Sequence, residues 1–156
     1  MSDAAPNRLP WPPIIYLAAI AISILLGVFV TLPWISRPMA DILFAAGCLS
    51  IVIVVAIDYS AFKALKNAKT TIMPTRASDH LVTTGPFSFT RNPIYLANTL
   101  LMIGIGLIAQ NAWFVLLALI AAFLTQKLAI EREERHLADR FGKRYRDYAK
   151  RVRRWI

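Results

Sequence analysis

The chain has 156 residues, of which 57% are hydrophobic and 17% charged, and its mean hydropathy is +0.51. The apolar residues form long blocks instead of amphipathic periods, which argues against a soluble protein. The net charge of +9 does not point to nucleic acid, because basic residues that flank apolar spans fix membrane topology and attract anionic lipid head groups. We therefore expect a membrane protein without a nucleic-acid partner.

Two apolar segments occupy the first half of the chain. Residues 14–34 are longer than the apolar core of a cleaved signal peptide and follow an interfacial Trp11, which predicts a retained membrane helix. A second span covers residues 39–62, and the short connection between the two spans predicts a tight hairpin of neighbouring helices. Asp41 and Asp58 lie near the ends of the second span. We expect both at the interface, because a charge at the bilayer centre costs about 2.5 to 3.5 kcal/mol.

Two further spans and a polar segment make up the second half. Residues 94–109 form a slightly short span, and residues 113–130 form the fourth. From Glu131 the chain turns strongly polar, which predicts a helix that leaves the membrane and breaks at Gly142. Beyond this break, apolar residues at intervals of three and four predict an amphipathic interfacial helix with arginines on its remaining surface. The apolar set is Tyr145, Tyr148, Val152 and Trp155, and the arginines are Arg144, Arg151 and Arg154.

The distribution of basic residues sets the expected orientation. The N-terminus, the loop after the second span and the C-terminal segment are basic, whereas the other two connections share only Arg37. Four spans with both termini in the cytoplasm satisfy the positive-inside rule. The sequence thus predicts an all-α integral membrane protein, a single domain over residues 1–156, with about four transmembrane helices and a cytoplasmic or interfacial helical segment at its C-terminus. We expect it in a bacterial inner membrane.

The polar loop of residues 63–93 is expected on the same membrane face as the C-terminal segment. Polar backbone close to hydrocarbon must be satisfied by protein or water, so a loop rich in proline and glycine implies a cavity with a polar lining. Within this loop Gly85 permits an unusual turn, Pro93 fixes φ, and Arg91 offers a planar cationic fork suited to a carboxylate. A helix-entry turn with an arginine that fixes topology is the alternative interpretation.

The third span contains a pair of glycines, Gly104 and Gly106. A dinucleotide-binding loop would need a preceding strand and a third glycine, and both are missing here. Close helix packing is the ordinary explanation of such a pair. The close approach of a flat ligand to the helix backbone is a second interpretation, which composition leaves open.

Three carboxylates, Glu131, Glu133 and Glu134, follow the fourth span. Surface ion pairing, for example of Glu131 with Arg135 one helical turn later, is one interpretation. Their expected position at the same interface as Arg91 favours a second interpretation, in which they belong to a common site.

Taken in order, these blocks resemble a family of membrane methyltransferases that includes isoprenylcysteine carboxyl methyltransferases and phosphatidylethanolamine N-methyltransferases. The resemblance implies an all-helical fold that binds S-adenosylmethionine on the cytosolic side, through elements in residues 70–95 and 131–156. Asn92 departs from the pattern, because the isoprenylcysteine branch usually has histidine there, and this weakens the transfer of that branch's substrate. The residues that carry the resemblance are Leu81, Val82, Thr83, Thr84, Gly85, Pro86, Phe87, Arg91, Asn92, Pro93, Ile94, Tyr95, Glu133, Glu134, Leu137, Phe141, Gly142, Tyr145, Tyr148 and Val152.

The resemblance also implies the site residues. Arg91 and Glu134 are expected to act in catalysis, and we expect no metal. Arg91 would suit the carboxylate of the cofactor, and Glu133 or Glu134 would suit its ammonium. The adenine could lie against Tyr95 or Phe87. The full cofactor-binding set is Gly85, Phe87, Arg91, Asn92, Pro93, Tyr95, Gly104, Gly106, Glu133 and Glu134.

The predicted activity is methyl transfer to a lipid-embedded or hydrophobic acceptor, by O- or N-methylation. A carboxylate acceptor needs no base, whereas an amine must be neutral, and His80, His136 or a glutamate could then take its proton. The competing hypothesis is a non-catalytic membrane adaptor whose basic tail binds anionic lipid or a partner protein. A transporter is a third hypothesis, disfavoured because the spans hold no paired charges. The sequence leaves the acceptor open among a phospholipid amine, a prenylated carboxylate and a small hydrophobic molecule.

Overall fold

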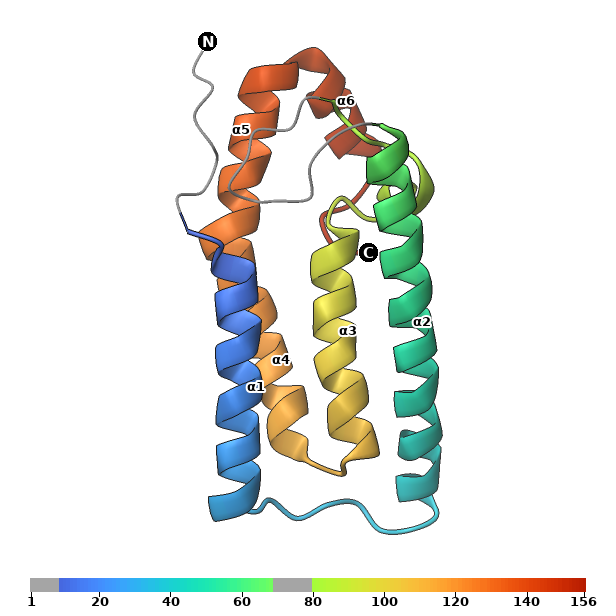
Figure 1. The fold of residues 1–156 in the computed structure, drawn as a ribbon, viewed down its shortest axis with the longest axis vertical. Helices are drawn as coiled ribbons and strands as arrows, with labels where there is room; N and C mark the ends of the chain where they lie inside the picture. The colour runs from blue at the N-terminus through green and yellow to red at the C-terminus, as the bar shows by residue number, and fades with distance from the viewer. Residues whose placement is uncertain (1–8, 69–79) are drawn as a thin grey trace.

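A computed structural model describes residues 9–68 and 80–156. In this part of the chain, long helices lie side by side as a shaft, and shorter elements form a cap at one end (Figure 1). The all-α prediction is confirmed. The shaft consists of α1 (Trp11–Phe29), α2 (Met39–Asn67), α3 (Pro93–Ile108) and α4 (Ala112–Thr125). The cap consists of the 3₁₀ turn η1 (Gly85–Ser88), the π-helical turn η2 (Gln126–Ile130), α5 (Glu131–Phe141), α6 (Lys143–Arg151) and the C-terminal segment of residues 152–156.

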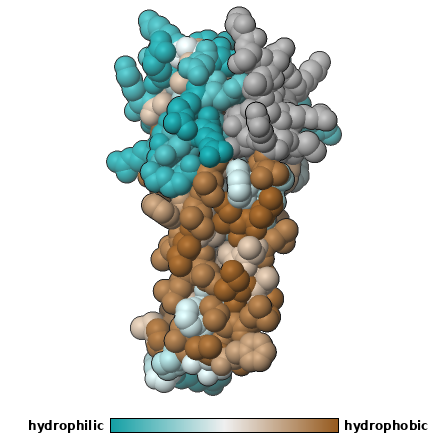
Figure 2. Space-filling view, turned by 90° about the vertical axis from the view of Figure 1, so that its left-hand side faces the viewer, coloured by the Kyte–Doolittle hydropathy of each residue, from teal (hydrophilic) through white to brown (hydrophobic). Residues whose placement is uncertain are grey.

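The shaft presents an apolar surface and the cap a polar one (Figure 2). Among the described residues, three helices are long and apolar enough to cross a membrane: α1, α2 and the continuous helix Ala112–Phe141, which joins α4, η2 and α5. α3 has 16 residues and is a shorter apolar helix. Because large apolar side chains line the outside of the shaft, its surface suits lipid better than water. The prediction of an integral membrane protein is confirmed.

The helices of the shaft approach one another through glycine. α2 packs along α3, and α4 packs along both α3 and α1. A Cβ atom on Gly47 would lie 2.9 Å from the Gly104 carbonyl oxygen, and a Cβ on Gly106 would lie 2.7 Å from the Cβ of Phe114. Small residues allow such close approach, and van der Waals packing holds helices together in a bilayer, where the hydrophobic effect does not.

The prediction of a tight hairpin between α1 and α2 is wrong. α1 ends at Phe29, before the predicted boundary at Trp34. Pro33 supplies a reason, because its ring would clash with the carbonyl of the residue four positions earlier, which is Phe29. α1 then packs on α4 while α2 packs on α3, and residues 30–38 cross the far end of the shaft (Figure 1).

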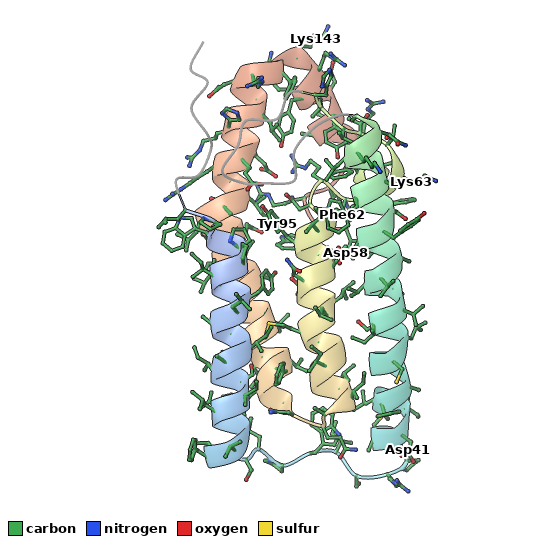
Figure 3. All side chains as sticks on the ribbon, in the orientation of Figure 1. Asp41, Asp58, Phe62, Lys63, Tyr95 and Lys143 are labelled. Carbon is green, nitrogen blue, oxygen red and sulfur yellow. The ribbon has the colours of Figure 1, made fainter. Side chains whose placement is uncertain are left out.

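The two aspartates of α2 have different surroundings. Asp41 is exposed near the end of the molecule opposite Lys143 (Figure 3), and its Oδ1 lies 3.3 Å from Arg37 Nε. Asp58 lies toward the cap and is half-buried, with an Oδ1 atom that is shielded from solvent. The interfacial position of both aspartates stays a prediction, and the Asp58 carboxylate is the more shielded of the two.

Candidate functional site

A compact turn places Arg91 directly ahead of α3. The turn begins at Gly85, whose φ of 62° lies in the left-handed region that favours glycine. The Pro86 carbonyl then accepts hydrogen bonds from the backbone N–H groups of Phe89 and Thr90, at 3.2 Å each. Pro93 occupies the first turn of α3, where a helix leaves N–H groups without internal partners. Arg91 is thus fixed between two well-defined turns at the boundary of shaft and cap.

The C-terminal segment runs alongside this turn. The Arg91 N–H donates to the Arg153 carbonyl at 2.9 Å. The Arg154 carbonyl accepts from the Thr90 hydroxyl at 3.1 Å and from the Asn92 amide at 3.0 Å. Because the predicted amphipathic helix ends at Arg151 and gives way to this extended segment, the prediction that Arg154 lies on the free surface of a helix is wrong.

An ion cluster joins the turn, the C-terminal segment and α5. The Arg154 guanidinium donates to both oxygens of Glu134, from Nε to Oε1 at 3.0 Å and from Nη2 to Oε2 at 2.7 Å. Arg91 Nη2 lies 3.2 Å from Glu134 Oε1, and these two side chains are only 15% and 16% exposed. Two-point arginine–carboxylate pairs are among the stronger polar contacts in proteins, and burial limits their screening by salt. Arg91, Glu134, Arg154 and Tyr145 form what we call the Glu134 cluster.

The Arg91 guanidinium is only partly satisfied by its neighbours. Its Nη1 donates to the Tyr145 hydroxyl at 3.4 Å, and its Nε is buried without a hydrogen-bond partner among the described residues. A buried donor without a partner is costly. The second arginine of the cluster, Arg154, is balanced by Glu134 and lies 3.8 Å from Glu131. An anionic group with an acceptor oxygen would match the unpartnered Nε donor of Arg91.

Two tyrosines of α6 support the cluster as neutral hydrogen-bonding groups. Burial, aided by the Glu134 carboxylate, raises the pKa of Tyr145 to about 12. Burial likewise raises the pKa of Tyr148, whose hydroxyl donates to the Phe87 carbonyl at 2.6 Å. Both tyrosines therefore stay protonated near neutral pH and do not serve as bases there. Hydrogen bonding to Glu134 also raises the pKa of Arg154, which stays cationic.

Glu133 faces a different neighbour from Glu134. The Tyr95 hydroxyl donates to Glu133 Oε1 at 2.8 Å, which links α3 to α5. Tyr95 lies where α3 meets the cap (Figure 3), and its carbonyl accepts a hydrogen bond from Tyr16 of α1 at 3.2 Å. The two adjacent glutamates thus anchor separate elements at one boundary.

The ion pairs of Glu131 differ from the predicted one. Glu131 Oε1 lies 2.8 Å from Lys127 Nζ and 3.8 Å from Arg154 Nη1. These contacts replace the suggested pair with Arg135. The reason is that η2 precedes Glu131 and the C-terminal segment folds back to it, so its neighbours are set by the cap and not by helix spacing alone.

The structure does not bring every predicted site residue to the Glu134 cluster. Gly104 packs on α2 and Gly106 on α4, and Gly104 is about 16 Å along α3 from Pro93 at 1.5 Å per residue. Helix packing accounts for both glycines. His80 is exposed, whereas His136 is half-buried. The predicted cofactor element of residues 70–95 extends over residues 70–79, which lie outside the described residues.

The sequence prediction assigned neither Arg154 nor Tyr145 to the site, and for Arg154 it also predicted the wrong conformation. A helix that continued past Arg151 would place three arginines on one exposed surface, and that periodicity concealed the change of conformation. Val152 offered a weak signal of a helix end, because a β-branched residue has a lower helix propensity. The pairing of residues 90–92 with residues 153–154 leaves no local pattern in the sequence.

The family model described as phospholipid methyltransferase matches residues 42–144, which is more than half of the chain. The chain belongs to this family. The match includes the Arg91 turn and Glu134 and ends before the C-terminal segment. Membership in the phospholipid methyltransferase family agrees with the apolar helices, which are long enough to cross a membrane.

Two curated proteins are similar to part of this phospholipid methyltransferase family member. The nickel-cobalt-cadmium resistance protein NccN of Alcaligenes xylosoxydans xylosoxydans is 39% identical over 78 residues, which are 49% of this chain and 36% of that protein. The cobalt-zinc-cadmium resistance protein CzcN of Cupriavidus metallidurans is 33% identical over 77 residues, 49% of this chain and 35% of that protein. The similarity thus spans about a third of each relative.

Proposed function

We propose that the protein transfers a methyl group from S-adenosylmethionine to a lipid-embedded or hydrophobic acceptor, at the boundary between shaft and cap. One observation carries this proposal. Arg91 and Glu134 come from separate elements and meet at 3.2 Å in a largely buried ion cluster, and Arg91 keeps a buried Nε donor without a partner among the described residues. The α-carboxylate of S-adenosylmethionine is an anion that such a donor suits.

We assign each part of the cofactor to a different residue at or near the cluster. Arg91 would hold the carboxylate. Both Glu134 oxygens accept from Arg154, so we assign Glu134 to holding the two arginines and assign the cofactor ammonium to Glu133. Tyr95 and Phe87 would flank the adenine. Gly85, Asn92 and Pro93 shape the turn, whereas Gly104 and Gly106 fall outside the proposed site because they pack between helices.

Methyl transfer mainly requires that the acceptor and the cofactor be correctly positioned. S-adenosylmethionine, when bound, supplies a methyl group that its sulfonium already activates. The protein's contribution is therefore to align the acceptor and to exclude water, which buried tyrosines and the ion cluster can do without a covalent step. Tyr145 and Tyr148 keep their protons near neutral pH, so they orient neighbouring groups and do not take a proton from the acceptor.

An apolar groove offers the acceptor a route from the bilayer. The groove lies between α2 and η1, has a volume of ≈ 500 Å³, and is lined by residues that include Ile57, Pro86 and Phe89. Phe89 is 77% exposed at its rim. Because Gly85 and Pro86 belong both to this groove and to the turn that carries Arg91, a hydrocarbon chain in the groove would place its polar end near the proposed site. We further propose that the cap faces the cytoplasm of a bacterial inner membrane, since the positive-inside rule favours that orientation.

Binding of the cofactor to purified protein tests the proposal. Calorimetric titration in detergent should show saturable S-adenosylmethionine binding, and Arg91→Ala should weaken it by roughly ten- to a hundredfold, as the loss of a charged hydrogen bond predicts. The probe 5′-methylthioadenosine lacks the amino-acid chain, its carboxylate and ammonium included, so Arg91→Ala should bind it as the wild type does. Arg132→Ala, on an exposed arginine of α5, is the matched control and should change neither affinity.

Two outcomes would overturn the proposal. If the wild-type protein shows no saturable cofactor binding, the proposed activity is refuted. Salt-dependent binding to anionic vesicles would then favour the adaptor hypothesis. Equal affinity of Arg91→Ala and wild type for S-adenosylmethionine would remove Arg91 from the site and leave the fold unaffected.

A further inference from the structure

Arg154 is fixed at both its backbone and its side chain. Its carbonyl accepts from Thr90 and Asn92, which flank Arg91 in sequence. Its guanidinium binds both oxygens of Glu134. The neighbouring Trp155 fastens the segment to η2, since its Nε1 donates to Gln126 Oε1 at 2.8 Å. The residue therefore ties the Arg91 turn to α5 at fixed spacing.

This arrangement limits how Arg91 can bind Glu134. A guanidinium next to a carboxylate usually forms two parallel bonds, one to each oxygen. Arg154 already holds Oε2 at 2.7 Å, and it shares Oε1 with Arg91, which contacts that atom at 3.2 Å. Arg91 is left with a single contact to Glu134 and with a buried Nε that has no partner in the described part of the chain.

We propose that Arg154 is a positioning residue for Arg91. By occupying Glu134, it prevents a two-bond Arg91–Glu134 pair and keeps Arg91 Nε available for the carboxylate of the bound cofactor. The inference rests on the proposed function, because it takes that carboxylate as the ligand of Arg91. It assigns to the C-terminal segment a role in ligand affinity in addition to its role in holding the cap together.

Two other roles for Arg154 make different predictions. If its guanidinium merely occupies the place of the cofactor's ammonium, its removal would free Glu134 and strengthen binding. If it serves only as a fastener, its removal would lower the melting temperature and would not discriminate between ligands with and without a carboxylate. A positioning role predicts weaker binding that is specific to the ligand with the amino-acid chain, which carries the carboxylate.

Arg154→Gln separates these roles. Its affinity for S-adenosylmethionine should fall by roughly three- to tenfold, as expected for residues coupled within one ion network, while its affinity for 5′-methylthioadenosine should stay unchanged. Arg154→Lys keeps the charge but lacks the fork, so it should restore part of the affinity even if Arg154→Gln is too unstable to purify. Trp155→Phe removes only the bond to Gln126. It should lower the melting temperature without changing the ratio of the two affinities.

A double-mutant cycle tests whether Arg154 acts through Glu134. In Glu134→Gln the anchor of Arg154 is weakened, so adding Arg154→Gln should cost little further affinity. Additive losses, an unchanged or tighter Arg154→Gln, or an equal loss for 5′-methylthioadenosine would each overturn the positioning role. If the wild type binds the cofactor and Arg91→Ala does not, these results refute this inference alone. A wild type that does not bind refutes the proposed function with it.

Discussion

The shaft and the cap hold their parts together by different contacts (Figure 2). In the shaft, α2, α3 and α4 meet through glycines at close range, and polar contacts between helices are few. In the cap, hydrogen bonds and ion pairs link segments that are far apart in sequence, such as Thr90 with Arg154. The shaft is therefore specified by shape and the cap by directed polar bonds.

The solvent explains this difference. A bilayer offers no partners for polar groups, so membrane helices satisfy their own backbone and associate by close packing. Water surrounds the cap and competes for every polar group, so a polar contact there contributes most where it is buried and has good geometry. The Arg91–Glu134 pair meets that condition, with about a sixth of each side chain exposed.

The largest loss of unfolding free energy is expected for a substitution in the shaft. Gly106→Leu places a large side chain where even a Cβ would lie 2.7 Å from Phe114. Overpacking of this kind should lower the free energy of unfolding by about 3 kcal/mol. Thermal unfolding in detergent, followed by tryptophan fluorescence, measures it. Ala45→Leu, at an exposed position of α2, is the control and should change little. Equal stability of the two variants would show that shape does not specify the shaft.

An intermediate effect is expected at the centre of the cap. Glu134→Gln leaves two guanidiniums facing a neutral amide, and the loss of charged hydrogen bonds should cost about 2 kcal/mol of unfolding free energy. Glu131→Gln is the matched control on the same helix. Glu131 is 31% exposed and pairs with the exposed Lys127, so its replacement should lower the stability less than that of Glu134 does. If both variants melt at the same temperature, burial is not what makes the Glu134 cluster important.

The smallest effect is expected for one neutral bond of the cap. Tyr148→Phe removes the hydroxyl that donates to the Phe87 carbonyl at 2.6 Å and keeps the ring. A single neutral hydrogen bond contributes about 1 kcal/mol, so the melting temperature should fall by a few degrees. Tyr59→Phe, on an exposed tyrosine of α2, should leave it unchanged. A wild-type melting temperature in Tyr148→Phe would show that this bond does not stabilise the cap.

Most of the shaft could be predicted from the sequence, and much of the cap could not. Long apolar runs indicate contact with lipid, so hydropathy alone predicts α1, α2, α3 and the helix that contains α4. Hydropathy does not predict which helices are neighbours, and α1 in fact packs on α4 instead of on α2. Periodicity describes each helix by itself and contains no information on which helices meet.

The candidate site shows the same division. Arg91 and Glu134 stood out because an arginine between turn-forming residues and a glutamate beyond the last span are local features. Arg154 did not, because its role depends on a segment that folds back across the cap. The sequence allows two interpretations of the glycines of α3, close helix packing and a ligand. The contacts of Gly104 and Gly106 are with neighbouring helices, which fits the first interpretation.

The π-helical turn at Gln126–Ile130 governs where the chain tolerates changes in length. A π turn contains one residue more than an α turn, so it rotates everything beyond it by about 100° relative to an uninterrupted α-helix. Deleting one residue there would restore regular α-helix and point Glu133 and Glu134 away from α3. Residues 30–38 cross the end of the shaft opposite the cap, and insertions there should leave the site residues in place.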